Sequence, residues 1–204
     1  MVIDSYELFK EFINKKHDSK PTLLLHACCA PCSTYVLELL NQFFDITIYY
    51  YNPNIYPISE FETRYEEFQK LGKYQLVKAE FNPNEFYEAV KGLEDKPEGS
   101  ERCFKCYELR LENSAIYASA NNFDYFSTTL SISPYKNSNK LNEIGQIMAN
   151  KYHVKFLYSN FKKNEGYKRS IGICRQLDIY RQDYCGCVFS FNEAKIRQDK
   201  KNSK

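Results

Sequence analysis

The 204-residue sequence predicts an α/β protein with a mostly parallel sheet covered by helices on both faces. Three observations predict this fold class. Short apolar runs alternate with segments of helical period along most of the chain. No window approaches the roughly 18 apolar residues of a membrane span. One apolar run ends in three cysteines at a strand-to-helix turn, which is where ligands bind in open α/β sheets.

The first elements alternate in the order that such a sheet requires. Residues 5–16 predict an amphipathic helix, with aromatic side chains at helical spacing. Residues 22–27 predict a buried strand, and a helix over 30–40 follows with Pro31 near its first turn, where a missing N–H costs nothing. The β-branched and aromatic run over 45–51 predicts a second buried strand.

The middle of the chain continues the alternation. Residues 59–71 predict a helix that stops at Gly72, and residues 74–78 predict a third short strand. A helix over 84–90 leads into the polar stretch 91–100, whose glycines and proline predict a loop.

A long helix over 103–121, a strand over 124–129, a helix over 140–152 and a last strand over 154–158 complete the pattern. Because the carboxyl ends of parallel strands share one edge of a sheet, the loops after the strands should converge there. These loops lie at 28–32, 52–54, 131–136 and 159–161.

Length and composition suit one domain over residues 1–190, followed by a basic tail over 191–204 that we expect to be partly disordered. The first residues carry acids and lack the features of a signal peptide, so we expect a cytoplasmic protein without a membrane partner. The sequence contains no Walker A motif, dinucleotide-binding glycine fingerprint or nucleophile elbow, which disfavours the functions that need them.

Eight cysteines in a cytoplasmic protein of this size point to metal binding or redox chemistry rather than to structural disulfides. Most of them cluster, at Cys28, Cys29 and Cys32, at Cys103 and Cys106, and at Cys185 and Cys187. Cysteines that only fill a hydrophobic core would not usually cluster in the sequence in this way. The eighth, Cys174, lies among apolar residues of a helical segment and is expected to be a buried structural residue.

Two thiolates at the start of a helix, such as Cys103 and Cys106, can share a metal ion or a cluster. The adjacent pair Cys28 and Cys29 would complete a set of four thiolates. Adjacent cysteines are awkward on a single tetrahedral zinc ion, so the spacing favours a multi-iron cluster, with a closed zinc site as the alternative. His26 is expected either to hydrogen-bond a cluster sulfur or to be a satisfied polar residue at the strand end.

The pair around Gly186, Cys185 and Cys187, can close a strained disulfide or chelate a metal, and labile pairs of this kind are typical of redox work. Tyr135 and Lys136 lie in a loop on the expected active edge and are candidates for substrate contact.

Charge is distributed unevenly along the chain. Residues 162–181 hold six Lys or Arg against two acids, so this segment is the candidate surface for a phosphate backbone.

Five motifs in order resemble those of the QueH epoxyqueuosine reductases, over residues 22 to 190. They are LHACCAPC at 25–32, YNPNI at 51–55, ERCFKCYELRL at 101–111, TTLSISPYK at 128–136 and YCGC at 184–187.

The resemblance implies a cobalamin-independent oxidoreductase that reduces epoxyqueuosine to queuosine at the wobble position of tRNA, with electrons from a separate donor. It also implies a Rossmann-like sheet of the adenine nucleotide α-hydrolase kind, with residues 1–190 as the catalytic domain. The carboxyl-terminal part of this fold is expected to be helical. A zinc-stabilised RNA-binding module and a thiol-disulfide oxidoreductase remain the alternatives.

The resemblance also implies roles for individual cysteines. A [4Fe-4S] cluster would be bound by Cys28, Cys29, Cys103 and Cys106. An additional iron ion beside the cluster would be bound with the help of Cys32, and Cys185 and Cys187 would be the redox-active pair.

Overall fold

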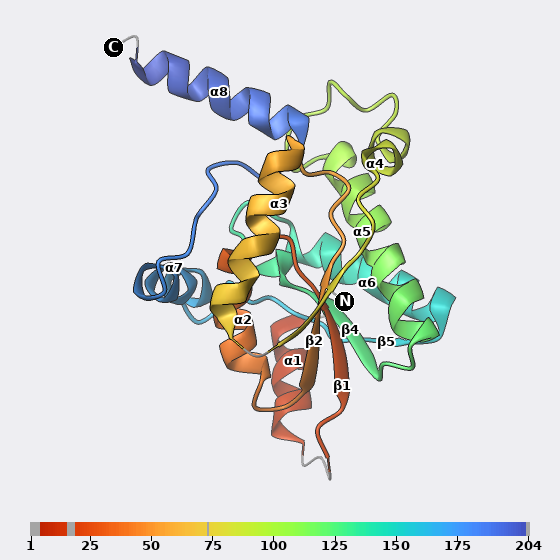
Figure 1. Cartoon of the computed structure of the whole chain (residues 1–204). Coiled ribbons are helices and arrows are strands. Elements are labelled where there is room, and N and C mark those ends of the chain that lie inside the picture. Colours follow the sequence, from red (N-terminus) through yellow and green to blue (C-terminus); the bar gives the residue numbers. More distant parts are fainter. Residues whose placement is uncertain (1–4, 16–18, 73, 203–204) are drawn as a thin grey trace.

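The computed structural model describes residues 5–15, 19–72 and 74–202, which form a five-stranded sheet with helices on both faces (Figure 1). The strands are β1 (Thr22–His26), β2 (Asp45–Tyr50), β3 (Gln75–Lys78), β4 (Tyr125–Thr128) and β5 (Lys155–Phe156). They lie in the order β3-β2-β1-β4-β5, and all neighbouring pairs are parallel. The predicted fold class is confirmed.

The central strand β1 shows why helices cover both faces. Its residues Leu23, Leu24 and Leu25 are all fully buried, as expected for a parallel strand without a solvent-facing side. Because strand side chains alternate between faces, Leu23 and Leu25 belong to one core cluster and Leu24 to the other.

Six helices cover the two faces. The first cluster is packed by α1 (Ser5–Asn14), α2 (Ala30–Leu40), α3 (Ile58–Glu66) and α7 (Gly166–Gln176), and the second by α5 (Glu101–Ala120) and α6 (Ser138–Tyr152). The remaining helices are α4 (Pro83–Ala89), α8 (Val188–Asn202) and two 3-10 helices, η1 (Glu67–Leu71) and η2 (Thr129–Ile132).

Most predicted elements are present within a few residues of their expected bounds. The predicted helix over 59–71 is divided between α3 and η1, and α5 begins two residues before the predicted start at 103. Position 16, the expected end of the first helix, lies outside the described residues.

The basic tail is helical over the residues that the structure describes. Where the sequence predicted partial disorder from residue 191, α8 continues as a helix to Asn202 and extends away from the body of the molecule (Figure 1), and residues 203 and 204 lie outside the described part. The reason lies in the first turns of α8, where Phe191 packs edge-on against the rings of Tyr56 and Tyr184 and where Ala194 is buried. This packing anchors the helix.

Hydrogen bonds join the loops at the carboxyl edge of the sheet, as predicted. Asn52 Nδ2 donates to the carbonyl oxygen of Ala27 over 2.9 Å, which links the loops after β1 and β2. The hydroxyls of Ser131 and Ser159 lie 2.8 Å apart and link the loops after β4 and β5. Within the described ranges, no helix is long and apolar enough to cross a membrane.

Candidate metal centre

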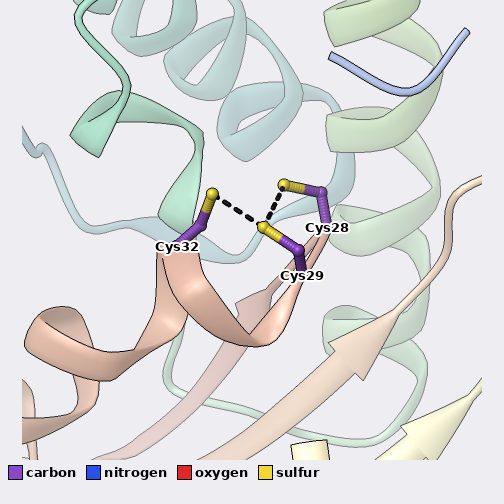
Figure 2. Close-up of side chains that lie close together, drawn as sticks. All are labelled: Cys28, Cys29 and Cys32. Carbon is purple, nitrogen blue, oxygen red and sulfur yellow. Dashed lines mark hydrogen bonds between the residues drawn. The ribbon is translucent and has the colours of Figure 1, made fainter. Parts of the chain in front are cut away.

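The segment over residues 28–32, which joins β1 to the first turn of α2, brings three thiols into contact, and we call it the cysteine turn. The Sγ atoms of Cys28 and Cys29 lie 3.6 Å apart, and those of Cys29 and Cys32 lie 2.8 Å apart. Figure 2 shows all three side chains pointing towards one another, two from the turn itself and Cys32 from the first turn of α2. Cys28 and Cys29 are buried, whereas Cys32 is partly exposed.

The pKa values of these thiols differ because of their neighbours. Hydrogen bonds from Cys29 and Cys32 hold the pKa of Cys28 well below its ordinary value, and the cations of Arg110 and Lys136 act in the same direction. Burial raises the pKa of Cys29 to about 12. Hydrogen bonding to Cys28 and Cys29 raises the pKa of Cys32. Cys28 is therefore the first thiolate of the group.

Four further cysteines form a second group. Cys103 and Cys106 lie in the first two turns of α5, and Cys185 and Cys187 lie in the loop before α8 (residues 184–187), which we call the cysteine loop. Cys106 and Cys187 pack in the same small apolar cluster, with Phe86.

Burial is the main cause of the pKa shifts of Cys103, Cys106 and Cys187 in this second group. It raises the pKa of Cys106 to about 12, and those of Cys103 and Cys187 in the same direction. All eight cysteines of the chain are free thiols.

Among the described residues, only Cys28, Cys29 and Cys32 form a group of three or more metal-ligand atoms within 4.8 Å of one another. Cys103 and Cys106 interact electrostatically with Cys185 and Cys187 instead. The four-thiolate set predicted from the sequence, Cys28, Cys29, Cys103 and Cys106, therefore stays a prediction.

Arg110 of α5 lies between the two groups of thiols, and its side chain is 1% exposed. It donates to Cys106 Sγ over 3.9 Å and to Asn52 Oδ1 over 2.7 Å, and the charge of Cys28 also acts on it. No carboxylate pairs with it anywhere in the described part of the chain. A buried guanidinium needs a nearby anion, so its position indicates thiolates or a negatively charged group at this site.

His26 supports Arg110 from the end of β1. Burial and the neighbouring charge of Arg110 lower the pKa of His26 to about 3, so the ring is neutral. Nε2 lies 3.3 Å from Arg110 Nε and 3.1 Å from the Tyr51 carbonyl oxygen, and Nδ1 lies 2.9 Å from Thr128 Oγ1. Of the two predictions for His26, the satisfied polar residue at the strand end is the one that these contacts support.

A second buried cation, Arg64 of α3, holds the cysteine loop. Arg64 Nη1 donates to the carbonyl oxygen of Cys185 over 3.0 Å, while its Nε donates to Glu60 over 2.7 Å. The middle residue of the loop, Gly186, has φ 140°, and a Cβ there would lie 3.1 Å from Arg64 Nη1. Both the backbone angle and the close guanidinium favour glycine.

The sequence predictions missed Arg64 and Arg110. Arg110 could have been found, because it lies one helical turn after Cys106 within the ERCFKCYELRL motif and therefore on the same face of α5. Arg64 lies 121 positions before its partner Cys185, and no local pattern connects the two residues.

A cavity of about 500 Å³ opens beside these thiols. Its lining includes Cys28, Cys32, Tyr135, Lys136, Arg181 and Cys185. Both candidates for substrate contact, Tyr135 and Lys136, are therefore at the cavity. Gln182, from the cavity wall, donates through Nε2 to Cys29 Sγ over 3.0 Å.

The basic segment over 162–181 contributes to this cavity through only part of its length. Lys168 and Arg169 are exposed and form ion pairs with Glu165 and Glu38. Arg181 lines the cavity, together with Arg197 of α8. The arginines on the cavity rim therefore come from the end of the basic segment and from the carboxyl-terminal helix, and the acidic residues Glu98 and Asp183 line the same cavity.

Thiols are soft ligands that suit zinc or iron–sulfur clusters. Arg64, Arg110 and Lys136 bring positive charge to the thiols, which would offset the negative charge of a thiolate-bound cluster. The donor set and its surrounding charges fit an iron–sulfur cluster.

A family model described as "Epoxyqueuosine reductase QueH" matches residues 23–193. A protein of that name from Streptococcus pyogenes serotype M1 is 45% identical over 185 residues, covering 86% of this chain and 72% of that protein. The protein of the same name from Staphylococcus epidermidis is 46% identical over 187 residues, covering 86% and 79%. That from Thermotoga maritima is 39% identical over 181 residues, covering 84% and 91%.

Among the solved structures that resemble the fold is one for which the match covers equal shares of both chains. It is described as a predicted subunit of tRNA methyltransferase from Methanocaldococcus jannaschii, with a TM-score of 0.51 at 10% identity and 76% of each chain covered. This likeness concerns the fold alone. Together with the parallel sheet, it confirms the α/β fold with a mostly parallel sheet that the sequence predicts.

Proposed function

The chain belongs to the epoxyqueuosine reductase QueH family, a family of oxidoreductases, and we propose that it reduces epoxyqueuosine to queuosine in tRNA without cobalamin. The substrate carries its epoxide on the modified base at the wobble position, and this reduction is the last step of queuosine synthesis. A tRNA substrate and a separate electron donor imply that the protein works in the cytoplasm.

The gathering of thiols and buried cations beside one cavity is the observation that carries the proposal. Removing the epoxide oxygen to leave an alkene breaks two C–O bonds and forms a C=C bond. It consumes two electrons and two protons, and the oxygen leaves as water. Ordinary side chains do not supply electrons, so the reaction needs a redox group at this site.

We assign Cys28, Cys29, Cys103 and Cys106 as the ligands of a [4Fe-4S] cluster. When bound, the cluster would supply electrons one at a time, and an additional iron ion, held in part by Cys32, would act as a Lewis acid. The chain prepares two of these ligands, since the Gly99 N–H donates to Cys103 Sγ over 3.2 Å and Arg110 donates to Cys106. Such bonds stabilise thiolates.

Cys185 and Cys187 are assigned as the redox-active pair. Cys185 lines the cavity, and Cys187 is buried behind it, where Ser190 Oγ lies 3.5 Å from its sulfur. The pair either relays electrons between dithiol and disulfide or helps to bind the additional iron. In both cases Arg64 fixes the backbone from which the two thiols project.

The modified base must leave the anticodon stack before it can reach the thiols. The cavity, at about 500 Å³, is large enough to receive a base. Tyr135 lines it and is 78% exposed, which offers an aromatic face for stacking. Arg181 and Arg197 on the rim are placed to contact phosphates.

Anaerobic purification, followed by metal and sulfide analysis and an absorption spectrum, tests the proposal first. We expect iron, acid-labile sulfide and a brown protein that converts epoxyqueuosine in tRNA when a chemical reductant is supplied. Zinc without iron would favour the RNA-binding module instead. Turnover by metal-free protein would favour the thiol-disulfide oxidoreductase.

A further inference from the structure

Lys136 carries a positive charge into the cavity beside the thiols. It lies in the loop after β4 and η2, and it lines the cavity together with Cys28, Cys32 and Cys185. All three of these thiols act on its charge. The backbone of this loop is held in place, because Lys162 Nζ donates to the Lys136 carbonyl oxygen over 2.7 Å.

The two buried arginines beside the thiols, Arg110 and Arg64, already donate hydrogen bonds to protein groups. Arg110 donates to His26, Asn52 and Cys106, and Arg64 donates to Glu60 and to the cysteine loop. The Lys136 ammonium, by contrast, takes part in no hydrogen bond or ion pair found among residues 5–15, 19–72 and 74–202. Its N–H donors are therefore available to a bound molecule.

Lys136 also keeps its charge. Desolvation acts to lower the pKa of Lys136, but the electrostatic effect of Cys185, Cys28 and Cys32 outweighs it and raises the pKa. A cation held in a partly enclosed cavity interacts with a developing negative charge more strongly than one in water.

The geometry points to a catalytic role for Lys136, and this role rests on the proposed function. Its ammonium binds the epoxide oxygen of the substrate. As the two C–O bonds break, negative charge collects on this oxygen, and the fixed ammonium stabilises it. The two electrons come from an external one-electron reductant such as dithionite, the C=C bond forms, and the two protons come from water, so that the oxygen leaves as water.

Single-turnover reduction of epoxyqueuosine-containing tRNA by the iron-loaded protein, at saturating tRNA, measures the role directly. We expect Lys136→Gln to lower the rate about 100- to 1,000-fold, the range for loss of one donor to a developing oxyanion. Lys136→Arg should keep much of the rate because it keeps the charge, and added methylammonium should restore part of the rate of Lys136→Ala. Iron content and absorption spectrum should stay those of the wild type.

A second measurement needs no turnover. Without reductant, the wild-type protein should bind tRNA containing epoxyqueuosine about tenfold more tightly than tRNA containing queuosine, because only the former has the oxygen that the ammonium binds. This preference should vanish in Lys136→Gln. Lys91→Gln is the matched control, since Lys91 is an exposed lysine after α4 that pairs with Glu88, and it should leave both rate and preference unchanged.

The possible results distinguish the role of Lys136 from the proposed function. A wild-type rate in Lys136→Gln would overturn the role of Lys136 alone. Loss of iron from that variant would make Lys136 a structural residue and would also overturn it. An iron-loaded wild-type protein that does not reduce the epoxide would overturn the proposed function, and the role of Lys136 with it.

Discussion

The cysteine turn and the cysteine loop present thiols to the same cavity, but the fold holds them in different ways. The cysteine turn continues directly from β1, whose register is set by parallel pairing with β2 on one side and β4 on the other. The cysteine loop belongs to no sheet and depends on Arg64 and on a bond from the Tyr56 N–H to the Gly186 carbonyl oxygen over 2.8 Å. The difference separates a rigid ligand platform from a segment held by a few contacts.

This comparison assigns different consequences to the two segments. Substitutions in the cysteine turn should remove the proposed metal group, and the reductase activity would be lost with it. Substitutions in the cysteine loop should lower the reduction rate and leave the proposed metal group in place.

The largest effect is expected from the platform and its predicted partner on α5. Either Cys28→Ala or Cys103→Ala should abolish activity and most iron binding, because each removes a proposed cluster ligand. Iron and sulfide analysis checks this result. Cys174→Ala is the matched control, since Cys174 of α7 is buried in the first core cluster, outside both groups of thiols, and this variant should retain its iron.

Replacement of the loop thiol comes next. Cys185→Ala should lower the reduction rate by at least about 100-fold, the usual minimum for loss of a residue with a direct chemical role, while most of the iron remains. Parallel rate and iron measurements on one preparation decide the matter. Disappearance of the cluster absorption in this variant would mean that the ligands have been assigned wrongly.

A smaller effect is expected from loosening the loop without removing a thiol. Gly186→Ala combines an unfavourable φ with a Cβ 3.1 Å from Arg64 Nη1, so we expect the free energy of unfolding to fall by about 1–3 kcal/mol. The reduction rate should fall with it, while the iron content stays constant. Denaturant unfolding provides the measurement.

Gly172→Ala is the control for this change. Gly172 lies in α7, and nothing stands within 4 Å of a Cβ added there, so this variant should gain about 0.5–1 kcal/mol. Equal stabilities for the two variants would contradict the strain assigned to Gly186.

The smallest effect is expected from the cavity rim. Replacing Arg181 and Arg197 together with Gln should weaken tRNA binding and lower the slope of log affinity against log salt by about 1.4–1.8, the contribution of two phosphate contacts. Binding titrations over a range of salt concentrations measure the slope.

The paired change of Lys168 and Arg169 to Gln tests the location of this surface, because these residues are already engaged with Glu165 and Glu38. It should alter the slope less than the rim change does. An equal or larger change would move the RNA surface to the outer face of α7.

The sequence predicts features that depend on neighbours in the chain. The alternation of apolar runs and amphipathic segments was enough to predict the parallel sheet. The sequence also placed Cys28, Cys29 and Cys32 on one strand-to-helix turn, although it assigned Cys32 a different role from the other two. The strand-end rule also placed Tyr135 and Lys136 at the cavity.

Features that depend on distant partners could not be predicted in the same way. The proximity of Cys106 to Cys187 and the bond from Arg64 to Cys185 join segments with no shared local pattern. Partial disorder of the tail was expected from its charge. The packing of Phe191 on Tyr56 and Tyr184 could not be foreseen, since these residues are far apart in the sequence and meet only in the folded chain.

The central claim is that this thiol-lined cavity removes the oxygen of an epoxide on tRNA. Its most direct test is mass spectrometry of the nucleosides from epoxyqueuosine-containing tRNA after one turnover with the anaerobically purified, iron-loaded and reduced protein. The account predicts queuosine, formed by loss of one oxygen atom and dependent on Cys185. Unchanged epoxyqueuosine from protein with a full complement of iron and sulfide would contradict it.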